Sequence, residues 1–229
     1  MAGSPAAAPA STRDALASVL KVNEIFLSIQ GETSLAGLPT VFVRLTGCPL
    51  RCRYCDTEYA FYEGEKMTVA EILRAVAGYR TRHVTVTGGE PLAQKPCLTL
   101  LRQLCDEGYR VSLETGGALD IGGVDPRVMK ILDLKTPGSG EVERNRYDNL
   151  GQLGEWDQVK FVICDRADYD WAGNMLNRHR LNERCEVLFS PAHGELDAAR
   201  LADWILEDRL PVRLQIQLHK HLWGDVRGK

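Results

Sequence analysis

The chain has 229 residues, of which 44% are hydrophobic and 26% charged, and its formal net charge is -3. This balance is typical of a globular domain with a real core, and so weak a net charge gives no global attraction to nucleic acid. The sequence has no apolar run approaching the ~18–20 residues that a membrane helix needs, so we expect no membrane span.

The cysteine content bears on the cellular compartment. Seven cysteines are present, and three of them fall between positions 48 and 55. An odd number with such a tight group is not typical of a disulfide framework, so a reducing, cytoplasmic location fits best. The start of the chain has no basic flank before a compact apolar stretch and is therefore not typical of a secretory signal.

In chain order, residues 1–21 are rich in Ala, Ser and Pro, and we expect a flexible N-terminal extension before a single domain over residues 22–229. Alternating or β-branched runs predict two strands before the cysteines and six after them. They span residues 22–29, 40–46, 83–87, 110–114, 128–134, 158–163, 186–190 and 212–217.

Between these strands, apolar periodicity predicts helices. Thr68 opens the first, with Glu71 three residues later as a capping box. Further helices are predicted at 96–107, 142–150, 167–181 and 196–207. Strands that alternate with helices predict a parallel α/β sheet, and about six parallel strands favour a partial, abbreviated β/α barrel over a complete eight-stranded one.

Cys48, Cys52 and Cys55 give the spacing CxxxCxxC. An ordinary structural zinc site or ferredoxin cluster takes four protein ligands, whereas this group stops at three. A [4Fe–4S] cluster bound here would keep one iron without a cysteine, open for chemistry. The alternatives are a zinc knuckle completed by a distant Cys or His, and a chance grouping.

Two further features indicate ligand binding. The turn Thr87-Gly88-Gly89-Glu90-Pro91 follows a predicted strand, at the end where parallel α/β folds bind ligands, although the same motif also suits a plain tight turn. Arg44 lies among apolar residues inside a predicted strand. Its charge must face solvent or have a partner, and one suitable partner is a ligand carboxylate.

The three cysteines, followed about 30 residues later by Gly-Gly-Glu-Pro, closely resemble the radical S-adenosylmethionine (SAM) superfamily. Within it, the chain from Val22 to Trp223 resembles the 7-carboxy-7-deazaguanine synthase family. The segments that carry this resemblance are Glu24-Ile25-Phe26, Gln30-Gly31-Glu32, Gly37, Phe42-Val43-Arg44, Gly47-Cys48, Tyr54-Cys55-Asp56-Thr57, Thr87–Pro91, Glu114-Thr115-Gly116-Gly117, Asp133-Leu134-Lys135, Lys160-Phe161-Val162, Ser190-Pro191, Gln215 and Gln217-Leu218-His219-Lys220.

The resemblance implies a carbon–nitrogen lyase with an abbreviated radical SAM barrel. Such an enzyme rearranges 6-carboxy-5,6,7,8-tetrahydropterin to 7-carboxy-7-deazaguanine and ammonia, on the route to queuosine and other deazapurines. The resemblance also implies one [4Fe–4S] cluster per chain, SAM used catalytically, Mg²⁺ and a homodimer. We further expect a flavodoxin- or ferredoxin-type electron donor, and no direct contact with nucleic acid or membrane.

Site residues are implied motif by motif. Cys48, Cys52 and Cys55 would hold the cluster, and the Thr57 hydroxyl would ligate Mg²⁺ unless it only caps the backbone. The implied substrate contacts are Ile29, Gln30, Gly31, Glu32, Arg44, Thr87 and His219. The implied SAM contacts are Gly89, Glu90, Asp133, Leu134, Lys135, Ser190, Pro191, Ala192 and His193. In some family members the last residue touches the substrate, but here Asp225–Lys229 follow, which leaves that contact open.

Two other functions remain as alternatives. A radical SAM activase that places a glycyl radical on a partner protein would share the cysteines and Gly-Gly-Glu-Pro. It would leave Gln-Gly-Glu, Arg44 and Leu-His-Lys unexplained. A zinc- or cluster-binding interaction module with no enzymatic activity is the second.

Overall fold

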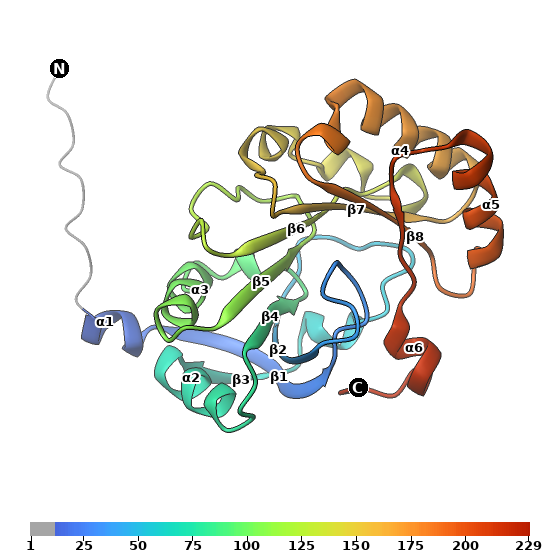
Figure 1. Cartoon of the computed structure of the whole chain (residues 1–229). Helices are drawn as coiled ribbons and strands as arrows, with labels where there is room; N and C mark the ends of the chain where they lie inside the picture. Colours follow the sequence, from blue (N-terminus) through green and yellow to red (C-terminus); the bar gives the residue numbers. More distant parts are fainter. Residues whose placement is uncertain (1–11) are drawn as a thin grey trace, which may run out of the picture.

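A nine-stranded sheet organises the structure, a computed structural model that describes residues 12–229 (Figure 1). The strands lie in the order β3-β1-β2-β4-β5-β6-β7-β8-β9. Their bounds are β1 Val19–Ile29, β2 Pro39–Leu45, β3 Glu65–Thr68, β4 His83–Gly88, β5 Arg110–Thr115, β6 Met129–Asp133, β7 Gln158–Ile163, β8 Glu186–Pro191 and β9 Arg213–Leu214.

Six α-helices accompany this sheet in the part of the chain that is described. They are α1 Thr12–Ala17, α2 Val69–Ala77, α3 Cys97–Asp106, α4 Arg166–His179, α5 Ala198–Asp208 and α6 Leu218–Trp223. The predicted capping box forms, because the Thr68 hydroxyl accepts from Glu71 N and the Glu71 carboxylate accepts from Thr68 N. None of these helices is long and apolar enough to cross a membrane.

The sheet is mostly parallel, as predicted. Every neighbouring pair from β2 to β9 runs parallel, whereas β1 is antiparallel to both β2 and β3. Over residues 12–229 the sheet stays open, since β3 and β9 each have a single neighbour. Six parallel strands after the cysteines and an open sheet agree with the expected partial barrel.

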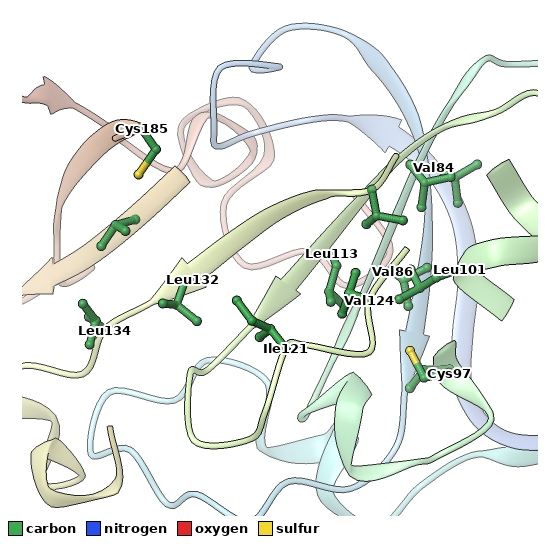
Figure 2. Close-up of a cluster of buried hydrophobic side chains, with 14 of the residues drawn as sticks. Val84, Val86, Cys97, Leu101, Leu113, Ile121, Val124, Leu132, Leu134 and Cys185 are labelled. Carbon is green, nitrogen blue, oxygen red and sulfur yellow. The ribbon is translucent and has the colours of Figure 1, made fainter. Parts of the chain in front are cut away.

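Alternation along the strands separates an apolar face from a polar one. In β2, Val41 and Val43 are fully buried in the core, while Phe42 and Arg44 line a cavity on the other face. The core lies between the sheet and its helices. In Figure 2, Val84 and Val86 of β4 and Leu113 of β5 gather with Leu101 of α3 in this core. The other face of the sheet, called the inner face below, lines the cavity and carries polar and charged side chains.

The structure departs from the predicted elements in three places. First, β1 begins at Val19 and Leu20 is fully buried, so the folded part starts before residue 22, while residues 1–11 of the predicted extension lie outside the described residues. Second, the four-residue β3 was not predicted, because Glu65–Thr68 has little β-propensity of its own and depends on pairing with β1.

The third departure concerns two predicted elements that differ in kind or length. The helix predicted at 142–150 is a pair of 3-10 helices, Val142–Arg144 and Tyr147–Gln152. The last predicted strand, at 212–217, is reduced to Arg213–Leu214. The chain then forms α6, and the residues after α6 run back toward β1 (Figure 1).

Candidate active site

A cavity of about 550 Å³ opens at the carboxyl ends of the parallel strands. Its wall comes from the ends of β1 and β2, the cysteine stretch, the ends of β4 to β8, and parts of residues 217–229. It brings together all of the predicted site residues except Gly31, Glu90 and Leu134. Ligands bind at this edge in parallel α/β folds, because the loops that follow the strands converge there.

Three half-buried thiols, those of Cys48, Cys52 and Cys55, lie on this wall and form no disulfide. Burial raises the pKa of Cys48 and raises that of Cys52 to about 11. The described lining residues include no fourth cysteine. Three soft sulfur donors that share one wall suit an iron–sulfur cluster with one open iron. Within residues 12–229, neither these three thiols nor any other three His, Cys, Asp or Glu side chains are gathered around a single metal ion, so the zinc-knuckle alternative finds no ready site.

The Gly-Gly turn after β4 packs directly against the start of the cysteine stretch. Gly88 has φ of +143°, and a Cβ there would collide with Leu45 O. A Cβ on Gly89 would collide with Gly47 O, and Glu90 N donates to the same carbonyl at 2.7 Å. Glycine is therefore required at both positions, and the turn fixes Cys48 relative to the sheet.

Glu90 lies behind the cavity wall. Its carboxylate accepts hydrogen bonds from Thr115 Oγ1 at 2.9 Å, Gly116 N at 2.7 Å and Leu92 N at 3.0 Å, and the residue is fully buried. Burial raises the pKa of Glu90. The carboxylate thus joins the turn after β4 to the end of β5. A direct contact between Glu90 and SAM stays a prediction.

The end of β6 and the cysteine stretch each present a buried polar atom without a hydrogen-bond partner in the described structure. Lys135 Nζ pairs with Asp133 Oδ2 at 3.0 Å. Asp133 Oδ1 and the Tyr54 hydroxyl are buried without a hydrogen-bond partner in the described structure. Such atoms normally have partners, so this part of the wall suits a bound polar ligand. Leu134 points into the core, because it alternates with its two neighbours.

The second predicted SAM segment, Ser190–His193, follows β8 on the same wall. Ala192 N donates to Ile163 O at 2.8 Å, which holds the segment over the end of β7. Arg53 of the cysteine stretch pairs with Glu195 at 2.7 Å. The two segments predicted to contact SAM and the cysteine stretch therefore surround one space.

The Gln-Gly-Glu turn after β1 also lines the cavity, through Gln30 and Glu32. Gln30 is buried and donates to Thr85 Oγ1 at 3.1 Å. Gly31 packs against His219, and a Cβ at this position would collide with His219 Nδ1. The missing side chain at Gly31 is what lets α6 place His219 on the cavity wall, where burial lowers the pKa of the imidazole.

Buried charges fill the centre of the sheet's inner face. Lys160 Nζ pairs with Glu32 at 2.7 Å and lies 3.6 Å from Asp133. Burial by itself would raise the pKa of Glu32, but the Lys160 ammonium outweighs it and holds the pKa below its ordinary value. Burial and the negative charge of Glu32 raise the pKa of Glu114, which accepts from Thr87 Oγ1 at 2.9 Å.

Arg44 has a protein partner as well as a place in the cavity. Its Nε lies 2.7 Å from Glu24 Oε1, and the two residues are cross-strand partners on β2 and β1. Among the described residues its two terminal nitrogens make no hydrogen bond. The expectation of a ligand carboxylate at Arg44 stays a prediction, and this geometry leaves the end of the guanidinium group available for one.

Thr57 lines the cavity next to Asp56. It precedes the 3-10 helix Glu58–Phe61, but its side chain makes no capping hydrogen bond there. The backbone-capping alternative is therefore not observed. A hydroxyl beside a carboxylate offers oxygen donors of the kind that Mg²⁺ prefers.

Sequence reasoning did not assign site roles to Lys160, Glu114 or the end of the chain, all of which line the cavity. A signal for Lys160 was present, since it is a charge inside an otherwise apolar strand, as Arg44 is. For the residues after Trp223 the only signal was the family resemblance, which left a contact between the tail and the substrate open, since nothing in their composition indicates that they return to the cavity.

This fold and this cavity define a radical SAM protein, and residues 42–134 match the Radical SAM superfamily. The 7-carboxy-7-deazaguanine synthase of Chlorobaculum tepidum is 48% identical over 91% of this chain and 97% of its own. The 7-carboxy-7-deazaguanine synthase of Koribacter versatilis is 42% identical over 89% of this chain and 97% of its own. QueE from Escherichia coli shares the fold, with a TM-score of 0.72 at 24% identity over 88% of this chain and 95% of that chain. The chain belongs to the 7-carboxy-7-deazaguanine synthase family.

Proposed function

We propose that this chain rearranges 6-carboxy-5,6,7,8-tetrahydropterin to 7-carboxy-7-deazaguanine with loss of ammonia, using a [4Fe–4S] cluster, SAM and Mg²⁺. The observation that carries the proposal is a near-full-length likeness to proteins of that name, at up to 48% identity. It is supported by a cavity that is lined by three cysteines and by an arginine whose terminal nitrogens make no hydrogen bond among the described residues.

In this proposal the cavity has two halves. Cys48, Cys52 and Cys55 hold the cluster, and Gly89 with the segments 133–135 and 190–193 holds SAM. Bound there, the cluster and SAM supply the one-electron chemistry that removes a hydrogen atom from the substrate. Because Gly88 and Gly89 have no Cβ, the turn after β4 packs against the backbone of Leu45 and Gly47, next to Cys48.

The second half orients the pterin. Arg44 pairs with the substrate carboxylate, while Gln30, Glu32 and Thr87 offer hydrogen-bonding groups to the ring system. Lys160 keeps Glu32 ionised, and an ionised carboxylate accepts from ring N–H groups. The Thr57 hydroxyl ligates Mg²⁺ close to Asp56.

The proposal extends to assembly and location. We propose a homodimer, a flavodoxin- or ferredoxin-type electron donor and a cytoplasmic enzyme with no direct contact to nucleic acid or membrane. Light scattering of the purified protein tests the dimer: a mass of one chain per particle would contradict it.

An anaerobic assay tests the activity. The protein is reconstituted with iron and sulfide, then mixed with SAM, reductant, Mg²⁺ and 6-carboxytetrahydropterin, and the products are identified by mass spectrometry. We expect 7-carboxy-7-deazaguanine without net consumption of SAM. SAM cleavage with an unchanged pterin would retain the superfamily but reject the substrate, and would bring the activase alternative forward. If metal analysis of the protein finds zinc but no sulfide, the result would favour the metal-binding module.

A variant tests the magnesium site in the same assay. Thr57→Ala should weaken the stimulation by Mg²⁺, since it removes the hydroxyl ligand but leaves the loop backbone in place. Thr99→Ala on α3, which does not line the cavity, is the control. Equal stimulation in Thr57→Ala and wild type would reject ligation at Thr57.

A further inference from the structure

The end of the chain forms part of the cavity. Residues 224–229 all line it, and Figure 1 shows how the chain returns from α6 toward the start of the sheet. Two side chains fix this tail. Asp225 pairs with Lys220 of α6 at 3.0 Å, and Arg227 reaches across to β1.

Arg227 makes the larger set of contacts. Its guanidinium lies 2.9 Å from Asn23 Oδ1, 3.1 Å from Glu63 Oε2 and 3.4 Å from Glu24 Oε2, and 4.1 Å from the centre of the Tyr59 ring. The guanidinium therefore meets two carboxylates and an aromatic face, and these contacts tie the segment to β1. The Arg227 side chain stays 47% exposed, and these contacts hold it on the Glu24 carboxylate that also binds Arg44.

Glu24 connects the tail to Arg44. One carboxylate oxygen, Oε1, accepts from Arg44 Nε at 2.7 Å and from the Tyr59 hydroxyl at 3.0 Å. The other oxygen, Oε2, faces Arg227. A carboxylate with both oxygens free can bind a guanidinium through two parallel hydrogen bonds. Because Arg227 occupies Oε2, Glu24 holds Arg44 through Nε alone.

We infer that Glu24 is a positioning residue through which the C-terminal tail sets the orientation of Arg44. With Arg227 in place, the terminal nitrogens of Arg44 stay free for a substrate carboxylate. Without it, Glu24 competes for the same nitrogens. The inference rests on the proposed function, because it takes the carboxylate of the pterin as the group that Arg44 binds.

This coupling predicts selectivity as well as affinity. A tail that only stabilises the fold would affect all pterins equally when it is loosened. A tail that acts through Glu24 and Arg44 affects only pterins that carry a carboxylate. The reconstituted holoenzyme with SAM can therefore be titrated with 6-carboxypterin and, separately, with pterin that lacks the carboxyl group, by fluorescence.

We expect Arg227→Gln to weaken 6-carboxypterin binding about tenfold and to leave the binding of unsubstituted pterin unchanged. In turnover, KM for the carboxylated substrate should rise by about the same factor, with kcat within about twofold. Arg227→Lys should recover part of the loss. Arg180→Gln should behave as wild type, because Arg180 is an exposed, ion-paired arginine at the C-terminal end of α4 and does not line the cavity.

A double variant tests the connection itself. If Arg227 acts through Glu24, then Glu24→Gln/Arg227→Gln binds 6-carboxypterin no more weakly than the weaker single variant. Equal losses for both pterins, additive losses in the double variant, or no loss in Arg227→Gln would each overturn the inference. If wild type itself shows no preference for 6-carboxypterin, the assignment of Arg44 fails, and the inference fails with it. If the preference is present and the variants keep it, only the inference fails.

Discussion

Arg44 illustrates what a single residue reveals. A charge inside an apolar strand predicted either a solvent-facing side chain or a partner. The structure gives a partner, Glu24, directly across the antiparallel pair of β1 and β2. The sequence indicated that Arg44 is unusual, but it did not indicate Glu24, because a cross-strand partner depends on register.

Substitution by lysine tests the guanidinium. Arg44→Lys keeps the charge but loses the planar pair of donors, so KM for 6-carboxytetrahydropterin should rise about tenfold or more. Iron and sulfide content should not change, since Arg44 does not contact the cysteines. Arg213→Lys, whose arginine pairs with Glu186 at the sheet edge, is the control. An unchanged KM would reject the carboxylate role.

Lys160 leads to a prediction about pH. Burial favours the protonated form of Glu32, and the Lys160 ammonium reverses this by holding its pKa below the ordinary value. Lys160→Gln removes the ammonium, so the pKa of Glu32 rises and the ionised form is lost at a higher pH. The acidic limb of the pH profile of kcat/KM should move upward. Lys66→Gln, on the exposed edge strand, is the control, and an unmoved limb would show that Glu32 does not need its charge.

At the scale of elements, local signals predicted most of the sheet. Strands β4, β5, β7 and β8 have strong β-branched or aromatic runs, and their positions agree with the prediction to within one or two residues. The elements that were missed or altered depend on distant contacts. The last strand ends at Leu214 where Gln215 Nε2 donates to Gly31 O and Gln217 Nε2 to Glu32, which lie near the other end of the chain.

The cap of α2 is a local feature that can be tested alone. Thr68→Ala removes the hydroxyl that accepts from Glu71 N, and the variant should lose about 1 kcal/mol in the free energy of unfolding. Chemical denaturation with a matched Thr99→Ala control measures the difference. Thr99 lies inside α3, where alanine is the better helix former, so the control should be neutral or slightly stabilising. Equal effects at both positions would contradict the capping role.

On the scale of the whole molecule, the core and the cysteine wall are separate. The core gathers side chains from β1 to β8 and from α2 to α5, whereas Cys48, Cys52 and Cys55 face the cavity from a segment without regular structure. Folding of the sheet therefore does not depend on burying these thiols, and the two roles of cysteine in this chain can be separated by substitution.

The triple variant Cys48→Ala/Cys52→Ala/Cys55→Ala should lose iron and sulfide but keep the circular dichroism spectrum of the wild type before reconstitution. Cys97→Ala should do the opposite, since Cys97, the first residue of α3, is fully buried in the core. It should bind a full cluster and lose about 1 kcal/mol in the free energy of unfolding. Loss of secondary structure in the triple variant would show that the cysteine wall supports the fold.

The sequence by itself determined the class of this protein, and all but three of the site residues that it predicted line the cavity. The cysteine spacing, the Gly-Gly-Glu-Pro turn and the strand periodicity are local, because each depends on residues close together in the chain. Tertiary structure alone decided that Glu90 lies behind the wall, that Gly31 makes room for His219, and that Arg227 meets Glu24. These depend on which distant segments meet at one end of the sheet, and that follows from strand order and register rather than from any local pattern.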